Sequence, residues 1–365
     1  MAEKQAPDAF LSELKKRAEW VYDYLRSNRY VGRFPEGHVR DAVYRYVDSC
    51  GKCLRPAVLL FSCGAVGGDE TKALPAAAGI EVFHTWTLVH DDIIDRDDRR
   101  RGKATVHAEF AARAETDLAL RGTEAEHYGT TVAILTGDIQ HGWAVSLFSE
   151  LSAQHGVDPA ISLYLVNCLN SEVLNRVMQG EMSDVQNSKA SIDELQEAVI
   201  LETIRMKTGA LYEFAGKAGA MIGLNTSDPR HKWVRAVSAF AEQCGAAFQL
   251  QDDILGIVGD EQRLGKPVGS DIREGKRTTI VYFALRNANS TERNRLKELL
   301  DNEVTTDDRV DEAVRLLADL GGIDETKRLA ERFVADSLRH LDKLPPSPYR
   351  DLMSSLAEYV ICRDF

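Results

Sequence analysis

Apolar residues recur with a helical period over nearly the whole of this chain. The clearest segments are residues 10–25, 41–50, 192–223 and 232–257. On an α-helix such spacing gathers the apolar side chains on one face, which has to be buried against other helices. No segment shows the apolar–polar alternation of a convincing strand. The pattern predicts an all-α fold, in which Ala and Gly within the helices allow close approach.

Nothing in the sequence divides the chain into separate domains. Its 365 residues contain no internal repeat and no Ser/Gly linker, and its 10 prolines fall mostly at turns or helix edges. We predict one helical domain over residues 1–365. Two polar stretches, 109–130 and 258–279, lack a clear apolar period and are predicted as loops, the first of them partly helical.

Composition limits where the chain acts and on what. A net charge of -12 disfavours nucleic acid and anionic lipid surfaces as partners. No apolar run reaches the roughly 20 residues of a membrane span, and the first residues lack an apolar signal segment. The 6 cysteines are few and irregularly spaced, which favours a reducing, cytoplasmic setting.

Cys50 and Cys53 form a CGKC pair that is compatible with half a zinc site or a redox dithiol. No second CxxC or His pair follows, and no βαβ pattern surrounds it. We interpret both as small, partly buried side chains.

Residues 91–101 read DDIIDRDDRRR, with 5 aspartates before or among 4 arginines. Asp91 and Asp95 are four residues apart, so on a helix they share one face, where two like charges are unfavourable without a cation between them. Carboxylate oxygens suit a hard divalent ion, and magnesium is usual where phosphate oxygens complete its shell. The stretch predicts a magnesium and phosphate site.

A second carboxylate pair lies far downstream. Asp252 and Asp253 follow Gln249 by three and four residues, so one helix face can carry all three. Like the first pair, this one ends an apolar helix and precedes basic residues. Because arginine and lysine bind phosphate, the two clusters together predict a substrate whose phosphates are held partly through metal and partly directly.

These motifs, in their order, resemble the trans-isoprenyl diphosphate synthases (polyprenyl synthetases) over about residues 30–290. The quoted segments are GKCLRP, HTWTLVHDDIIDRDDRRRGKATVH, ILTGD, KTGAL, FQLQDDILG and GKPVGSDIREGKRT. The resemblance implies a helical bundle around a deep central cavity, usually as a homodimer. It implies a prenyltransferase that condenses isopentenyl diphosphate with dimethylallyl, geranyl or farnesyl diphosphate, releases pyrophosphate and uses Mg²⁺, with three ions in each active site.

The resemblance also implies roles for individual residues. The magnesium ligands would be Asp91, Asp95 and Asp252, with Asp92 and Asp253 beside them and Asp184 and Asp271 in their outer shell. The allylic diphosphate would be held by Arg100, Lys207, Lys266 and Lys276. Isopentenyl diphosphate would be held by Lys52, Arg55, His84 and Arg101. Thr208 and Gln249 would lie beside the reacting carbons.

Three features depart from the family pattern. Gly256 stands where many members have a third aspartate, and Glu181 stands where many short-chain members have glutamine. The segment between His107 and Tyr128 is longer than usual.

The residues before the first aspartate pair bear on product length. Phe83 and Trp86 precede Asp91 by eight and five positions, which places them about 12 and 7 Å down a helix axis and about 60° apart. They are either a bulky floor to the cavity or ordinary core aromatics. Thr87 is small, whereas farnesyl-producing relatives often have an aromatic there. The pattern resembles archaeal-type geranylgeranyl diphosphate synthases, with a farnesyl or longer-chain polyprenyl synthase as the alternative.

Two other classes fit less well. A class I terpene cyclase also has a DDxxD helix, but its second metal motif mixes Asn, Ser and Glu, and it has no use for a second basic site. A non-catalytic regulatory subunit typically loses the aspartates, and both pairs are intact here.

Overall fold

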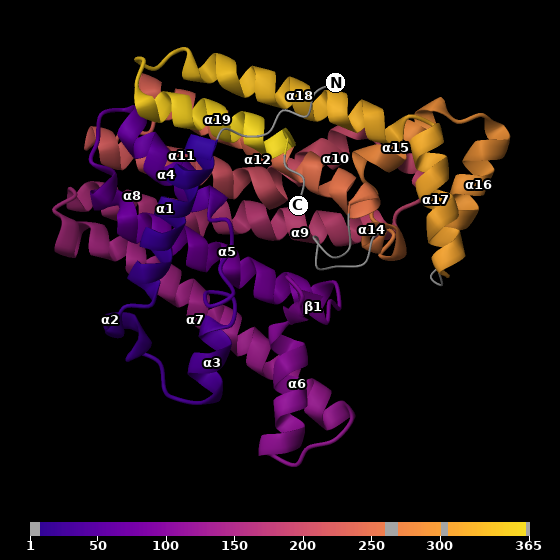
Figure 1. Ribbon diagram of the computed structural model, residues 1–365, viewed down its shortest axis with the longest axis horizontal. Helices are drawn as coiled ribbons and strands as arrows, with labels where there is room; N and C mark the ends of the chain where they lie inside the picture. The colour runs from indigo at the N-terminus through magenta and orange to yellow at the C-terminus, as the bar shows by residue number, and fades with distance from the viewer. Residues whose placement is uncertain (1–7, 260–268, 301–305, 363–365) are drawn as a thin grey trace.

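The computed structural model describes residues 8–259, 269–300 and 306–362. Within these ranges the chain is built almost entirely from helices, which confirms the all-α prediction (Figure 1). The described strands are two residues each and pair as one antiparallel hairpin, β1 (Arg99–Arg100) and β2 (Lys103–Ala104). Across the described part of the chain, no helix has the length and apolar character needed to cross a membrane.

The helices of the first half carry the first aspartate pair and the residues upstream of it. They are α1 (Asp8–Leu25), α2 (Asn28–Val31), α3 (His38–Tyr44), α4 (Leu54–Ala65), η1 (Glu70–Ala73), α5 (Leu74–Ile94), α6 (Val106–Asp117), α7 (Thr123–His155) and α8 (Pro159–Cys168).

The helices of the second half carry the second aspartate pair. They are η2 (Leu169–Val173), α9 (Leu174–Lys189), η3 (Ile192–Glu194), α10 (Glu197–Ile204), η4 (Arg205–Gly209), α11 (Ala210–Leu224), α12 (Lys232–Val258), α14 (Ser270–Arg273), α15 (Thr279–Asn287), α16 (Ser290–Leu300), α17 (Asp307–Asp319), α18 (Gly322–Leu341) and α19 (Pro348–Cys362).

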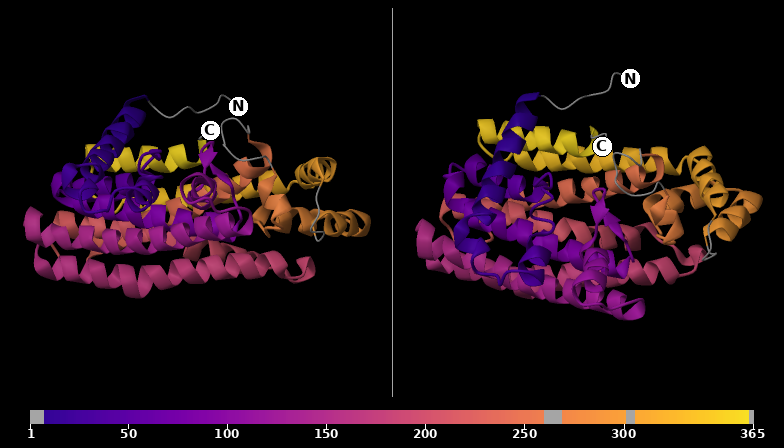
Figure 2. Two further views of the ribbon diagram at one scale, coloured as in Figure 1. Left: turned by 90° about the horizontal axis from the view of Figure 1, so that it is seen from below. Right: turned by 60° about the horizontal axis from the view of Figure 1, so that its bottom comes forward.

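The long helices run side by side, with α7 and α9 along one side of the bundle (Figure 2). Helix α11 lies between α4 and α12, α5 packs along α7, and α18 packs along α12. Small residues make the central contact close, because a Cβ at Gly219 would lie 2.1 Å from the Leu59 carbonyl oxygen. The Ala- and Gly-rich helices therefore meet backbone to backbone, as their sequences indicate.

Two predicted helices are shorter or more irregular than expected. The segment 41–50 is helical only to Tyr44. Residues 192–223 do not form one helix, since they divide into η3, α10, the π-helical turn η4 and α11. A π turn inserts one extra residue into the helical ladder and re-aims the side chains near it. The apolar period continues through the turn, so the sequence pattern does not reveal it.

The stretch 109–130 is more helical than the partly helical loop that was predicted, while most of the described residues of 258–279 lie outside helices, as predicted. Helix α6 and the start of α7 occupy the first stretch and project from the bundle as an arm (Figure 1). The apolar stripe of α6 is only one residue wide, because the buried residues Val106, Phe110 and Ala114 are spaced four apart. The polar residues between them obscure the helical period in the sequence. In the second stretch, residues 260–268 lie outside the described residues and 270–273 form α14.

Adding one methyl group at Gly219 tests the close approach of α4 and α11. We expect Gly219→Ala to lower the free energy of unfolding by about 1–3 kcal/mol, because the methyl would overlap the Leu59 carbonyl oxygen. A Cβ at Gly209 would come no nearer than 3.6 Å to a neighbour. Gly209→Ala is therefore the matched control. Urea denaturation of both variants measures the difference, and equal unfolding free energies would contradict the packing argument.

Candidate active site

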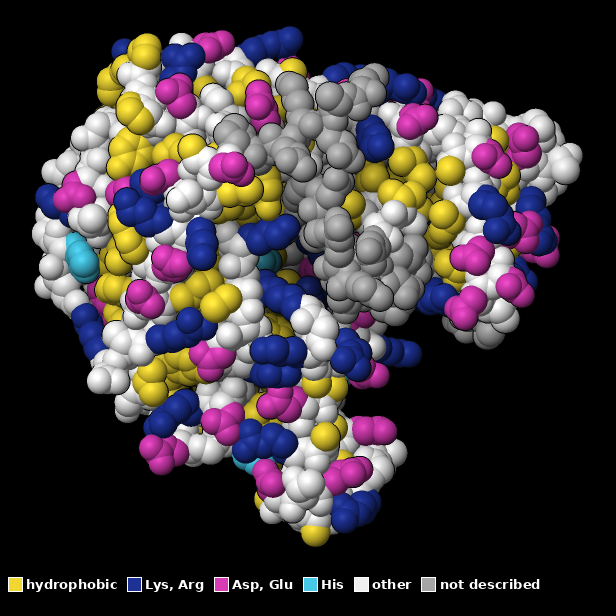
Figure 3. Space-filling model, viewed as in Figure 1, with side chains coloured by type: hydrophobic (Ala, Val, Ile, Leu, Met, Phe, Trp, Pro, Cys, Tyr) yellow, Lys and Arg dark blue, Asp and Glu magenta, His cyan; other side chains and the backbone are white. Residues whose placement is uncertain are grey.

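A cavity of about 840 Å³ opens between α5, α9, η4 and α12. Figure 3 shows a hollow in the middle of this face, edged by Lys and Arg side chains. Every predicted site residue that the structure describes lines this cavity, except Phe83, Asp92 and Asp184. Lys266 lies outside the described residues. The fold thus gathers residues that are up to about two hundred positions apart in the chain.

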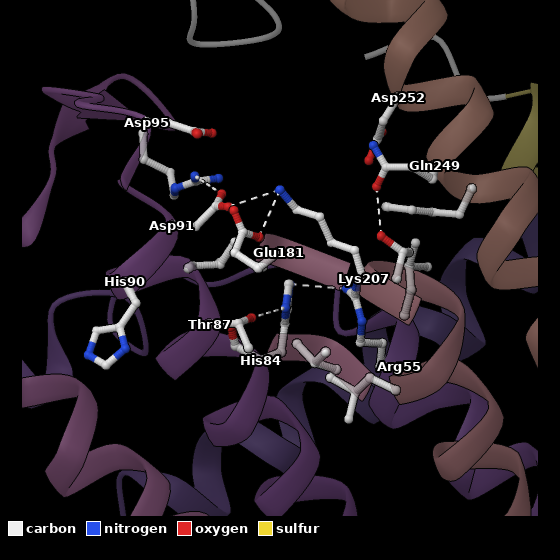
Figure 4. A pocket seen from close by; sticks show the side chains of 18 of the residues that line it. Arg55, His84, Thr87, His90, Asp91, Asp95, Glu181, Lys207, Gln249 and Asp252 are labelled. Atoms are coloured by element: carbon white, nitrogen blue, oxygen red, sulfur yellow. Dashed lines mark hydrogen bonds and ion pairs between the residues drawn. The ribbon is translucent and has the colours of Figure 1, made fainter. Parts of the chain in front are cut away.

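Carboxylates meet at the C-terminal end of α5. Oxygens of Asp91, Asp95 and Glu181 all lie within 4.8 Å of one another, and Glu181 comes from α9 (Figure 4). Asp252, the third metal ligand suggested by the resemblance, lies on α12 across the cavity. The glutamate that departs from the family pattern therefore adds a carboxylate to the first aspartate pair.

Two lysines hold these carboxylates together in the ligand-free protein. Lys207 Nζ lies 3.3 Å from Asp91, 2.9 Å from Glu181 and 2.8 Å from Asp184. Lys276 Nζ lies 3.1 Å from Asp95 and 2.7 Å from Glu274. Burial would lower the pKa of each ammonium, but the surrounding carboxylates outweigh it and raise that pKa. Both lysines are charged.

The acidic group fits a divalent cation. Burial raises the pKa of Glu181 to about 7, with repulsion from Asp91 adding to it, while Lys207 opposes the shift. Among the described residues, Glu181 Oε1 is buried and has no hydrogen-bond partner. A buried carboxylate oxygen without a donor, next to two others, is the donor set that Mg²⁺ prefers.

The arginine run after the first aspartates forms a tight hairpin. Arg101 (φ 52°) and Gly102 (φ 73°) are its two turn residues, and both have the positive φ of a type I′ turn. The hairpin brings Arg100 back to α5, where its Nε lies 2.7 Å from Asp92 Oδ1 and its Nη2 lies 3.5 Å from Asp91. Tyr46 donates a hydrogen bond to the other oxygen of Asp92.

Asp92 therefore has a different position from its two neighbours in the motif. Its side chain is buried behind the cavity wall and holds Arg100, whereas Asp91 and Asp95 face the cavity. The resemblance placed Asp92 only beside the magnesium ligands. In this geometry it positions a basic side chain.

The second aspartate pair belongs to a polar chain that starts at η4. The π turn points Lys207 and Thr208 into the cavity, and Thr208 Oγ1 donates to Gln249 Oε1 at 2.7 Å. Gln249 Nε2 in turn donates to Asp253 Oδ1 at 2.9 Å. Burial and then the nearby Asp271 raise the pKa of Asp253. These hydrogen bonds fix the orientation of Thr208 and Gln249, the two polar groups predicted to face the reacting carbons.

Gly256 leaves room for another carboxylate. A Cβ at this position would lie 3.0 Å from Asp271 Oδ2, so the Asp271 side chain occupies the space next to the glycine. Asp271 also lines the cavity and lies 3.8 Å from Lys276. The carboxylate absent from the second motif is thus supplied from α14.

The residues predicted to hold isopentenyl diphosphate form a separate basic region. Arg55 Nη1 donates to His84 Nε2 at 3.1 Å, and its guanidinium lies over the rings of Tyr212 and Phe248. Burial and the charge of Arg55 lower the pKa of His84, so the imidazole is neutral before a ligand binds. Lys52 lies two residues before the start of α4 and lines the same cavity.

Trp86 forms the wall below the aspartates. It lines the cavity together with Thr87. Phe83 is fully buried and packs edge-on against Trp86, with ring centroids 4.8 Å apart. The ring of His141 of α7 contacts the same indole in a tilted arrangement, with ring centroids 5.1 Å apart. Of the two predicted floor residues, Trp86 meets the cavity and Phe83 supports it from behind.

Three contributors escaped the sequence reasoning. Glu81 lines the cavity, and its only signal was a charge within an apolar run. Glu274 pairs with Lys276 inside a quoted motif. Tyr46 carries no local signal, because its role depends on a contact with Asp92 that the fold alone creates.

Comparisons with known proteins identify the family. The family model for polyprenyl synthetase matches residues 36–317. The chain belongs to the polyprenyl synthetase family. It is 33% identical to a geranylgeranyl diphosphate synthase of Methanosarcina mazei over 355 residues, which is 97% of this chain and 98% of the relative.

Two solved structures of this family have the same fold. One is the geranylgeranyl pyrophosphate synthetase of Pyrococcus horikoshii, with a TM-score of 0.79, 31% identity and coverage of 98% of this chain and 99% of that one. The other is the Corynebacterium glutamicum geranylgeranyl pyrophosphate synthase in complex with isoprenyl diphosphate and magnesium, with a TM-score of 0.77, 25% identity and coverage of 97% and 98%.

Magnesium and inorganic pyrophosphate are expected to stabilise the protein cooperatively. Lys207 and Lys276 occupy the carboxylates, so Mg²⁺ alone has to compete with them, whereas pyrophosphate attracts the lysines and frees the carboxylates. Together the two ligands should raise the melting temperature by more than the sum of their separate shifts. Differential scanning fluorimetry measures this.

Two variants make the melting experiment specific. Asp91→Asn should make the joint shift in melting temperature equal to the sum of the separate shifts, because it removes a carboxylate from the acidic group. Asp319→Asn makes the same change of charge at an exposed position and serves as the control. Simple additivity of the two shifts in the wild-type protein would refute the model of competing lysines.

Proposed function

We propose that this protein is a trans-prenyltransferase that condenses isopentenyl diphosphate with an allylic diphosphate and releases pyrophosphate. The observation that carries the proposal is one cavity with two distinct charged regions, one rich in carboxylates paired with Lys207 and Lys276, and one basic. The family membership and the names of the similar proteins support it. Incubation with labelled isopentenyl diphosphate and each allylic primer, followed by sizing of the products, tests it.

The first step breaks the allylic C1–O bond, and its electron pair leaves with pyrophosphate. Arg100, Lys207 and Lys276 bind the departing oxygens and stabilise the charge that develops on them. Mg²⁺, when bound by Asp91, Asp95 and Asp252, supplies Lewis-acid stabilisation of the same charge. Glu181, from the same acidic group, is a further ligand in this proposal.

The second step joins the two substrates. The double bond of isopentenyl diphosphate attacks the allylic cation and forms the new C–C bond, after which a proton is lost to the departing pyrophosphate. Thr208 and Gln249 direct oxygens toward the cation, and Phe248 contributes an aromatic surface. No protein nucleophile is needed. A terpene cyclase would not require the basic region at Arg55 and His84.

Geranylgeranyl diphosphate is the proposed product. Trp86 bounds the cavity below the aspartates, while the smaller Thr87 leaves space beside it. The name of the Methanosarcina relative supports this product over farnesyl diphosphate. Trp86 is the bulky residue of this wall that meets the cavity. In this proposal, the distance from its indole ring to the diphosphate therefore sets the length of the product.

The proposed assembly is a homodimer in the cytoplasm. Apolar side chains are more than one-third exposed on neighbouring helices, which is typical of a subunit interface; they are Ile134, Leu135, Leu163, Met182, Val185 and Val199. All six cysteines are free, which supports a reducing compartment. Sedimentation velocity tests the oligomeric state.

Turnover should depend on a divalent cation and on both aspartate pairs. Asp91→Ala or Asp252→Ala should lower kcat by about three orders of magnitude, because the charge of the leaving group loses its stabilisation. Incorporation of labelled isopentenyl diphosphate measures the rate, with Asp319→Ala as the control. Full activity in excess chelator would be incompatible with the proposal.

The wall residues should control product length. The double variant Phe83→Ala with Trp86→Ala is expected to lengthen the product by one or more isoprene units, because it opens the cavity below the aspartates. Thr87→Phe adds bulk at the adjacent lining position and should shorten the product. Chromatography of the dephosphorylated alcohols measures both. An unchanged product distribution in the double variant would place the floor elsewhere.

A further inference from the structure

Helix α1, which precedes the segment matched by the family model, contacts residues that line the cavity. Tyr22 and Arg26 lie one turn apart at the C-terminal end of this helix. The Arg26 guanidinium lies 5.2 Å from the centre of the Tyr22 ring, so the two side chains form one surface. That surface contacts the segment between α3 and α4, residues 47–53, which carries Lys52.

Tyr22 joins this segment to α5. Its hydroxyl donates to Glu81 Oε1 at 2.8 Å and accepts the backbone N–H of Gly51. A hydroxyl has one proton and an ionised carboxylate can only accept, so the directions of both bonds follow. The Tyr22 oxygen, which is buried, therefore fixes the Cys50–Gly51 peptide unit, one residue before Lys52.

Arg26 holds the other end of the same segment. Its Nη2 donates to the Val47 carbonyl at 2.7 Å and lies 3.0 Å from Cys50 Sγ, and its Nε donates to Asp48 at 3.2 Å. The planar guanidinium thus contacts three residues of the segment at once. A lysine or glutamine could not reproduce all of them.

The segment needs such support because its backbone is strained. Cys50 (φ 46°) and Cys53 (φ 48°) are both in the left-handed region, which non-glycine residues adopt only when surrounding contacts impose it. A Cβ on Gly51 would lie 2.8 Å from Arg101 Nη2 and 3.2 Å from the Tyr22 hydroxyl. The segment is therefore pressed between α1 and the arginine hairpin.

Helix α1 is itself held firmly. Arg17 forms a buried ion pair with Glu70 at 2.8 Å, and the Phe10 ring packs against Tyr359 of α19 at 5.6 Å. The apolar face of the helix is buried along its length. A contact made by Tyr22 or Arg26 is thus a contact to the rigid bundle.

We propose that Tyr22 and Arg26 are positioning residues for isopentenyl diphosphate, which hold residues 47–53 in the strained conformation that presents Lys52 and Arg55 to the diphosphate. The inference rests on the proposed function and deepens it. Neither residue touches the substrate. Their effect should therefore appear on one substrate only, since the allylic region depends on Lys207, Lys276 and Arg100 instead.

Removing a single hydroxyl tests the proposal. We expect Tyr22→Phe to raise the KM for isopentenyl diphosphate about tenfold, the size of one lost hydrogen bond, and to raise its dissociation constant in calorimetry equally. The kcat and the KM for the allylic primer should stay within about twofold of wild type. Tyr24→Phe is the matched control, because Tyr24 lies on the same helix and donates to Glu150 at 2.9 Å, away from the cavity.

Two more variants keep the result decisive. Arg26→Gln changes a partly exposed side chain and should raise the same KM a few-fold, even if Tyr22→Phe proves unstable. Arg55→Ala, within the predicted site, should raise the KM for isopentenyl diphosphate far more than that for the primer.

The outcomes separate the two levels of the proposal. An equal effect of Tyr22→Phe and Arg26→Gln on both substrates, or no effect in variants that melt as the wild type does, would overturn the positioning role alone. A wild-type protein that neither binds nor consumes isopentenyl diphosphate would overturn the proposed function together with it.

Discussion

Two partly buried lysines make the acidic cavity possible. Lys207 pairs with Asp91, Glu181 and Asp184, and thereby ties η4 to α5 and α9. Lys276 ties the segment after α14 to the end of α5 through Asp95. Like charges gathered this closely repel one another unless a cation lies between them. The ammonium groups therefore hold several helices at their present spacing until cations and a diphosphate replace these pairs.

Local departures from regular helix place these groups. The π turn at 205–209 directs Lys207 and Thr208 into the cavity, and the positive φ values of Arg101 and Gly102 fold the arginine run back on α5. Each irregularity lies between regular helices that fix its ends. The site is thus built from strained or unusual backbone on a rigid bundle, where such strain can be maintained.

The sequence predicts what depends on spacing within one helix, and it misses what depends on contacts between helices. The all-α architecture and the shared helix face of Asp91 and Asp95 follow from helical periodicity. The roles of the other site residues came from the resemblance of the ordered motifs to the trans-isoprenyl diphosphate synthases. The stretch 109–130 was predicted as only partly helical because the apolar stripe of the helix at 106–117 is narrow. The grouping of Glu181 with the aspartates requires α9 to lie beside α5. No local pattern encodes that arrangement.

The two halves of the cavity differ in charge, and in the proposed reaction this difference would distinguish two substrates that both carry a diphosphate. On the allylic side, carboxylates outnumber the basic groups around Lys207 and Lys276, so a bare diphosphate is repelled and enters with cations. On the other side, Lys52, Arg55 and Arg101 face one buried acid, Glu81, whose charge is shared with Tyr22. A bare diphosphate is attracted there. In the proposed reaction, discrimination between two substrates with identical diphosphate groups would therefore start from the cations that accompany one of them, and the hydrocarbon chains would act second.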